Sequence, residues 1–68
     1  MEFTAILTPV IEGGFVALNP ETGTTTQGET VEEALFNLRE ATELFLEEFP
    51  VHIGGRSLLT TFEISSHA

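Results

Sequence analysis

The amino-acid sequence predicts an α+β domain in which three strands are followed by one helix and a fourth strand. Three observations support this prediction. Two glycine-containing turn signals separate short runs of β-forming residues, and a long segment with helical periodicity begins at a capping signal. In the last part of the chain, apolar residues recur at alternate positions, as in a strand. We expect the whole chain, residues 1–68, to form a single domain.

The first three strands are predicted at residues 3–8, 15–18 and 24–27. Apolar residues of both parities in the first run are typical of a strand inside a sheet, whereas the threonines of the third run suit an exposed edge. Gly13 and Gly14 can take the positive φ of a tight hairpin, and a second turn signal lies at residues 19–23. Two successive hairpins make the three strands antiparallel.

The helix is predicted at residues 31–48. Thr30 and Glu33 have the spacing of a capping box, in which the Glu33 side chain reaches back to the backbone of Thr30, and Pro50 ends the segment. Glutamates occupy most of the surface outside one apolar face. The residues of that face, which we expect to be buried, are Val31, Ala34, Leu35, Leu38, Ala41, Thr42 and Phe45, with Phe49 extending it.

The fourth strand is predicted at residues 58–65, where Leu58, Phe62 and Ile64 share one parity. A right-handed crossover through the helix would place this strand parallel to the first and beside it, in the order 3-2-1-4. A single helix covers only one face of such a sheet. The other face carries apolar residues such as Ile6 and Leu18, so we expect a homodimer or higher homo-oligomer formed through a sheet face or an edge strand.

The composition restricts the possible partners. Eleven glutamates stand against two arginines, no lysine and no aspartate, so the net charge is -9. Such a chain repels a phosphate backbone and an anionic membrane surface, and it attracts a basic protein. The absence of cysteine excludes disulfides and thiolate metal sites. Without a signal peptide or a long apolar stretch at its amino terminus, the protein is expected to be cytoplasmic.

The sequence offers little for catalysis, and we expect a protein that is not an enzyme and needs no cofactor or metal. A Ser-His-Glu arrangement would have to draw on serines and histidines in a turn, at a strand end or at the terminus, namely Ser57, Ser65, Ser66, His52 and His67. Two-metal nuclease chemistry would need carboxylates converging on the sheet, for which the candidates are Glu2, Glu12 and Glu63. His52 is interpreted as an ordinary loop histidine.

A contact surface for a partner is predicted on the acidic side of the helix. Two large apolar residues lie there, outside the buried face, and they are either isolated exposed residues or part of a binding site. The candidate partner-binding residues are Glu33, Phe36, Glu40, Leu44 and Glu47.

Three segments resemble the amino-terminal domain of HicB antitoxins. They are the strand Gly-Gly-Phe-Val-Ala at residues 13–17, the Pro-x-x-Gly turn at residues 20–23, and the run Thr-Gln-Gly-Glu-Thr-Val-Glu-Glu-Ala at residues 26–34. The last is the most specific, and the resemblance extends over nearly the whole chain. We interpret Gly28 as supplying an unusual backbone angle and Ala34 as permitting close helix packing. Asn19 stands where the family usually has phenylalanine.

The resemblance implies a truncated RNase H-like fold without that family's catalytic carboxylates, and a role in neutralising a HicA toxin, a small basic ribonuclease. Members of the family usually carry a carboxy-terminal DNA-binding module, whereas this chain ends at Ala68. We therefore expect a stand-alone antitoxin domain whose DNA autoregulation is lost or delegated to another chain. Two alternatives stay open: an orphan HicB-like oligomeric interaction module with no toxin partner, and a protein with remnant nuclease activity.

Overall fold

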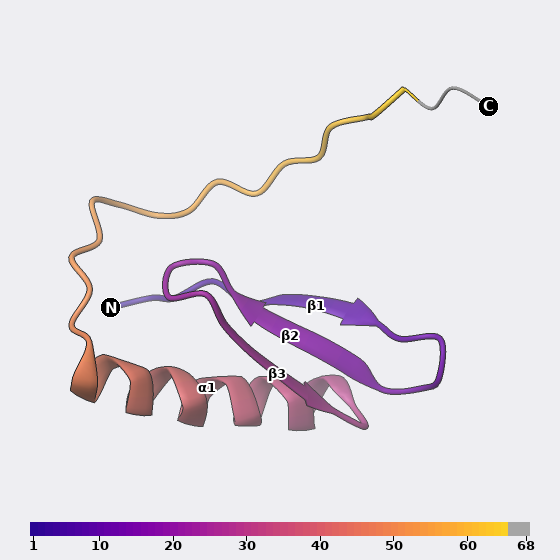
Figure 1. Cartoon of the computed structure of the whole chain (residues 1–68), viewed down its shortest axis with the longest axis horizontal. Helices are drawn as coiled ribbons and strands as arrows, with labels where there is room; N and C mark the ends of the chain where they lie inside the picture. The colour runs from indigo at the N-terminus through magenta and orange to yellow at the C-terminus, as the bar shows by residue number, and fades with distance from the viewer. Residues whose placement is uncertain (66–68) are drawn as a thin grey trace.

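Three antiparallel strands and one helix make up the regular structure of the protein, as a computed structural model that describes residues 1–65 shows (Figure 1). The sheet has the order β1-β2-β3. The α+β class and the β-β-β-α order predicted from the sequence are confirmed. The elements are β1 (Ile6–Pro9), β2 (Phe15–Asn19), β3 (Thr24–Gly28) and α1 (Val31–Glu48).

Both hairpins form where the turn signals predicted them. In the first, Gly13 and Gly14 have φ values of 111° and 83°, and the Val10 N–H donates to the Gly14 carbonyl at 3.0 Å. In the second, Gly23 has a φ of 80° and its N–H donates to the Asn19 carbonyl at 2.8 Å. The pairing places Ile6 opposite Leu18. Because alternate residues face opposite sides of a sheet, these two apolar residues share the face turned away from the helix.

The helix begins and ends as its capping signals predicted. The Glu33 N–H donates to the Thr30 hydroxyl at 3.1 Å. The Glu33 carboxylate returns to the backbone one residue earlier than expected, since it accepts from the Glu29 N–H at 2.6 Å and not from Thr30. At the other end, Phe49 is the C-cap and Pro50 follows it. The Thr30 hydroxyl thus satisfies one of the helix's otherwise unpaired amino-terminal donors, and the Glu33 carboxylate ties the residue before the N-cap to the first turn.

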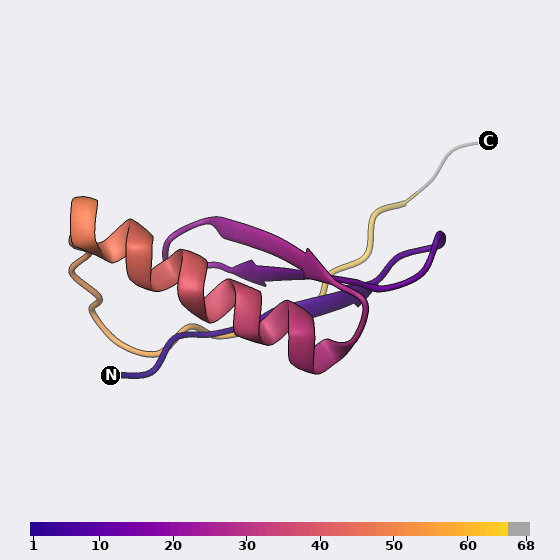
Figure 2. The same ribbon diagram turned by 90° about the horizontal axis from the view of Figure 1, so that it is seen from below.

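The core lies where α1 crosses β2 and β3, as the two views in Figures 1 and 2 agree. Ala17, Ala34 and Leu38 are buried there. The interpretation of Gly28 as a residue of unusual backbone angle is wrong, because its φ is not positive. A Cβ on Gly28 would lie 2.5 Å from the Ala34 nitrogen, so Gly28 permits close contact between β3 and α1. The interpretation of Ala34 as a close-packing residue is confirmed.

The fourth strand is absent from the structure. Residues 58–65, which we call the arm, form no strand, and the sheet order is 3-2-1 without a fourth member. Leu58, Phe62 and Ile64 are 97%, 83% and 81% exposed. Their alternation is typical of a strand, but a strand also needs a neighbour for its backbone hydrogen bonds. The arm extends past the β1 side of the sheet without pairing with it (Figure 1).

Candidate functional site

The predicted partner-binding residues form one exposed stripe along α1. They recur at intervals of three and four residues, which places them on the side of the helix opposite Ala34 and Leu38. Phe36 and Leu44 are 60% and 64% exposed. We call this set the acidic stripe; its members are Glu33, Phe36, Glu40, Leu44 and Glu47. The structure therefore brings all five residues together, with two apolar side chains among three carboxylates.

The carboxylates of the acidic stripe are not equivalent. Glu33 is engaged in the helix cap through the Glu29 N–H. Within the described part of the chain, neither a hydrogen bond nor an ion pair involves the Glu40 or Glu47 side chain. The one arginine of the helix, Arg39, contacts Glu43 at 3.9 Å on the exposed surface. Glu40 and Glu47 could therefore form ion pairs with a basic partner, whereas Glu33 would contribute mainly through its charge.

The predicted buried face of α1 is only partly buried. Ala34, Leu38 and Thr42 are inside, whereas Val31, Leu35 and Phe49 are exposed. The helix packs mainly on β3 and β2 and less on β1, and among the described residues no further strand lies beyond β1 to cover the rest of this face. Among residues 1–65, no helix is long and apolar enough to cross a membrane.

A groove of about 450 Å³ lies beside these exposed residues. It runs between the segment that leads into β1, residues 1–5, and the helix, and the apolar residues Ala5, Leu35 and Leu46 contribute to its walls. Thr42 also lines it and is 7% exposed, and its hydroxyl has no hydrogen-bond partner among the described residues. The groove therefore combines apolar walls with one unsatisfied polar atom, which is unusual in a completed core.

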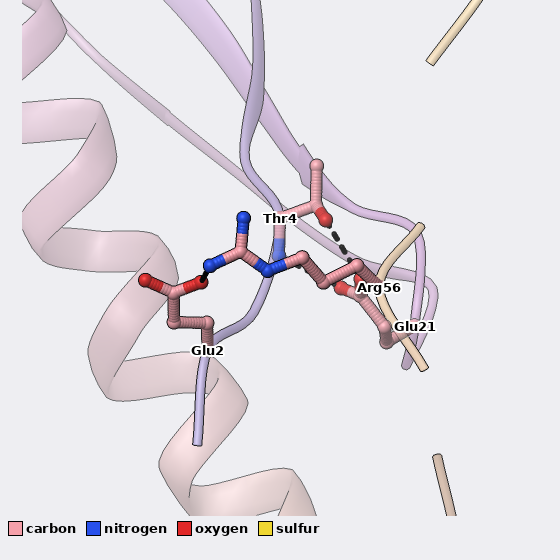
Figure 3. A network of polar contacts seen from close by, with 4 residues as sticks. All are labelled: Glu2, Thr4, Glu21 and Arg56. Atoms are coloured by element: carbon pink, nitrogen blue, oxygen red, sulfur yellow. Dashed lines mark hydrogen bonds and ion pairs between the residues drawn. The ribbon is translucent and has the colours of Figure 1, made fainter. Parts of the chain in front are cut away.

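A polar network, which no sequence signal indicated, joins the residues just before the arm to the sheet. The Glu21 carboxylate accepts from the Thr4 N–H at 2.9 Å, from the Thr4 hydroxyl at 2.7 Å and from the Ser57 hydroxyl. Arg56 forms an ion pair with Glu2 (Figure 3). Residues 56 and 57, distant in sequence from the amino terminus, are thus held beside it.

Asn19 is the buried centre of the same network. It is 1% exposed, and its side-chain N–H groups donate to the Thr4 carbonyl at 2.8 Å and to Glu21 at 2.7 Å. Its side-chain oxygen accepts from the Thr22 N–H and hydroxyl. The Asn-Pro-Glu-Thr-Gly sequence signals a turn, and an asparagine at its first position is typical of side-chain to backbone bonding two or three residues on.

Hydrogen bonding lowers the pKa of Glu21 from 4.5 to about 2, first through Ser57 and then through Thr4. A carboxyl whose pKa is lower in the folded state stabilises that state above its unfolded pKa. The contribution is therefore complete above pH 4.5 and is lost as the pH falls towards 2. We expect an NMR titration of the Glu21 carboxyl to report this low pKa, and Ser57→Ala to raise it. Thr60→Ala, outside the network, should leave it unchanged; an ordinary pKa in the unmodified chain would contradict the network.

The residues considered for catalysis do not converge. Ser57 contacts Glu21, whereas His52 is exposed in the linker after α1. Glu2 and Glu12 lie beyond opposite ends of β1. Ser65 and Glu63 are in the arm, and Ser66 and His67 lie outside the described residues. Within residues 1–65, no group of three or more histidine and acidic side chains is arranged to hold a metal ion.

No protein-family model, curated protein or solved structure matches the chain.

Proposed function

We propose that the protein is a HicB-like antitoxin domain of truncated RNase H-like architecture, which acts in the cytoplasm by binding a small basic HicA-type mRNA-cleaving toxin. The proposal rests on the sequence resemblance at residues 26–34 and on the acidic stripe. Binding of the toxin would be a protein contact without catalysis, cofactor or direct nucleic-acid binding. The observation that carries it is the exposed arrangement of Phe36 and Leu44 among Glu33, Glu40 and Glu47.

The packing role of the resembling segment supports the proposal. Gly28 and Ala34 form the contact between β3 and α1, and Thr30 with Glu33 caps the helix. Residues that the resemblance rests on thus determine where α1 begins and how closely it lies on the sheet. Such a segment would hold α1 at a fixed position on the sheet. The exposed side of the helix would then be a rigid surface, as a binding site requires.

Electrostatics support a basic partner. The chain carries a net charge of -9, and the acidic stripe contains no basic residue. The acidic stripe would attract the cationic surface with which the free toxin binds RNA, and it would cover that surface in the complex. Two exposed apolar side chains within the stripe would supply contacts that charge alone does not, because burial of apolar area slows dissociation.

Charge reversal on the acidic stripe tests the proposal. We expect Glu40→Lys combined with Glu47→Lys to slow association with the toxin about tenfold at low salt, and to flatten the dependence of that rate on salt. The measurement is stopped-flow or surface-plasmon-resonance kinetics with the small basic protein encoded next to this chain, after co-expression has shown whether a complex forms and growth arrest is relieved.

The control for this experiment is Glu12→Lys combined with Glu63→Lys, which changes the net charge equally but lies in the first hairpin turn and the arm. Equal slowing by both pairs would indicate an effect of net charge alone and would move the interface off the stripe. Absence of any complex, with growth arrest unrelieved, would remove the antitoxin assignment.

The second candidate is an orphan HicB-like oligomeric module with no toxin partner. The exposed apolar arm and the groove beside β1 favour it, since both are features of a chain that assembles with other chains. A genome with no small basic protein encoded beside this one would favour this candidate over the antitoxin.

A further inference from the structure

Among the residues that the structure describes, none pairs with the backbone groups on the outer edge of β1. Thr4 turns both its N–H and its carbonyl towards the β2 side, where they bond Glu21 and Asn19. Val10 does the same with the first hairpin turn. Because backbone groups alternate in direction along an antiparallel strand, those of Ala5 and Leu7 point outward from the sheet. This edge can therefore accept another strand.

The groove described above adjoins this edge. Ala5, directly before β1, lines it on one side, and Leu35 and Leu46 of α1 line it on the other. A strand added to β1 would place every second side chain between β1 and α1. Apolar side chains there would cover Leu35, which is otherwise exposed, and a strand's backbone or a threonine would give the Thr42 hydroxyl a partner.

The arm has the composition that this site requires. Leu58, Phe62 and Ile64 share one parity and are exposed, while Thr60 lies among them. Seven residues in extended conformation span about 23 Å, enough to follow the whole of β1. Residues 57–62 and residues 3–10 carry no charge, so two copies of this -9 chain can meet through these segments without opposing their glutamates.

The exposed surface of the chain is too large for a completed fold. A compact chain of 7.4 kDa exposes about 4,200 Å², whereas this one exposes 5762 Å². Its radius of gyration is 14.0 Å, against about 11 Å for a compact domain of this length. The excess of about 1,500 Å² is larger than the roughly 800 Å² that each partner buries in a stable interface.

The residues just before the arm, 56 and 57, are held on the face of the sheet turned away from α1. Ser57 bonds Glu21, which also bonds the Thr4 hydroxyl, and Thr4 shares the sheet face of Ile6. That face is turned away from α1, because Ala5, just before β1, and Leu7 in β1 pack on the core. These contacts hold residues 56 and 57 at the Thr4 side chain and beside Glu2, and beyond them the arm leads away from its own sheet (Figures 1 and 2).

We propose that two copies of this chain exchange their arms: each arm adds a strand to the free edge of β1 in the other copy and buries Leu58, Phe62 and Ile64 against that copy's groove. The contact is reciprocal, as a two-fold dimer requires. It is a property of this chain alone, and it is measured without any toxin.

The first test is the mass of the full chain in solution, measured by light scattering after gel filtration. We expect a dimer, of twice 7.4 kDa. Phe62→Glu places a charge on the buried side of the exchanged arm, and we expect it to raise the dimer dissociation constant about 100-fold or more, since two arms are affected. The matched control is Thr61→Glu, which adds the same charge to the opposite side of the arm and should have a much smaller effect.

A cross-linking experiment identifies which arm occupies the edge. The chain has no cysteine, so Thr8→Cys combined with Thr61→Cys introduces the only two thiols. Both positions lie near the middle of their segments, so a short bismaleimide can join them whichever way the arm runs. We expect a covalent two-chain product. An internal link within a monomer would show that the chain's own arm occupies the edge, and a monomer without a link would leave the edge to a different protein; either result would overturn the exchange.

Discussion

Replacement of Gly28 by alanine is expected to lower the free energy of unfolding by about 3 kcal/mol. A Cβ at this position would lie 2.5 Å from the Ala34 nitrogen and 2.9 Å from its Cα. Both are backbone atoms at the beginning of α1, so the helix would have to move away from β3. A domain of this size has a total stability of about 3 to 10 kcal/mol, so the loss would be a large part of it.

The measurement for Gly28→Ala is thermal unfolding followed by circular dichroism, with an expected fall in Tm of more than about 10 °C. Gly54→Ala is the matched control. A Cβ there would meet nothing within 4 Å, and Gly54 does not have a positive φ. Equal melting temperatures for the Gly28 variant and the unmodified chain would mean that β3 and α1 are not in the close contact described.

Replacement of Asn19 by alanine is expected to cost about 3 kcal/mol of stability. The substitution removes the partner of the partly buried Thr4 carbonyl and of the partly buried Thr22 N–H, and it deprives Glu21 of one of its donors. Each buried group left without a partner carries a penalty of about 1 to 3 kcal/mol, and the vacated space adds to it. Urea unfolding at neutral pH measures the loss.

Asn37→Ala is the control for the Asn19 variant. Asn37 also donates from its side chain to a backbone carbonyl, that of Gln27, at 2.9 Å, but at an exposed position. Water replaces such a bond, so we expect a change of less than about 1 kcal/mol. If the two asparagine variants unfold at the same urea concentration, Asn19 does not have the buried role that its contacts imply.

The elements with local signals were predicted well. The bounds of α1 agree with the prediction because Thr30, Glu33 and Pro50 act within one helical turn of the residues they affect. The hairpins agree because glycines at residues 13, 14 and 23 take the positive φ that their turns require. The acidic stripe followed from helical periodicity alone, and the structure places its five residues on one exposed side.

The contacts between distant segments were not predictable in the same way. Asn19 and Gly28 were interpreted as turn or backbone-angle residues, since a sequence does not show that Thr4 or Ala34 will lie beside them. Ser57 gave no signal of its bond to Glu21. The prediction of a fourth strand was wrong for a related reason. The alternation of its residues indicates that one side of the segment is suited to burial, but it does not indicate which strand the segment would pair with.

The sequence by itself determined the class of the protein, the order of its first four elements, the residues of its caps and turns, and an acidic helix surface suited to a basic partner. These depend on interactions within a few residues, or on composition. Only the tertiary structure decided that β3 and α1 meet at Gly28, that Asn19 is buried, and that the arm leaves its own sheet and exposes the edge of β1. Each of these features depends on how segments that are distant in sequence lie relative to one another. Packing and long-range hydrogen bonds decide that arrangement, and local sequence signals do not report it.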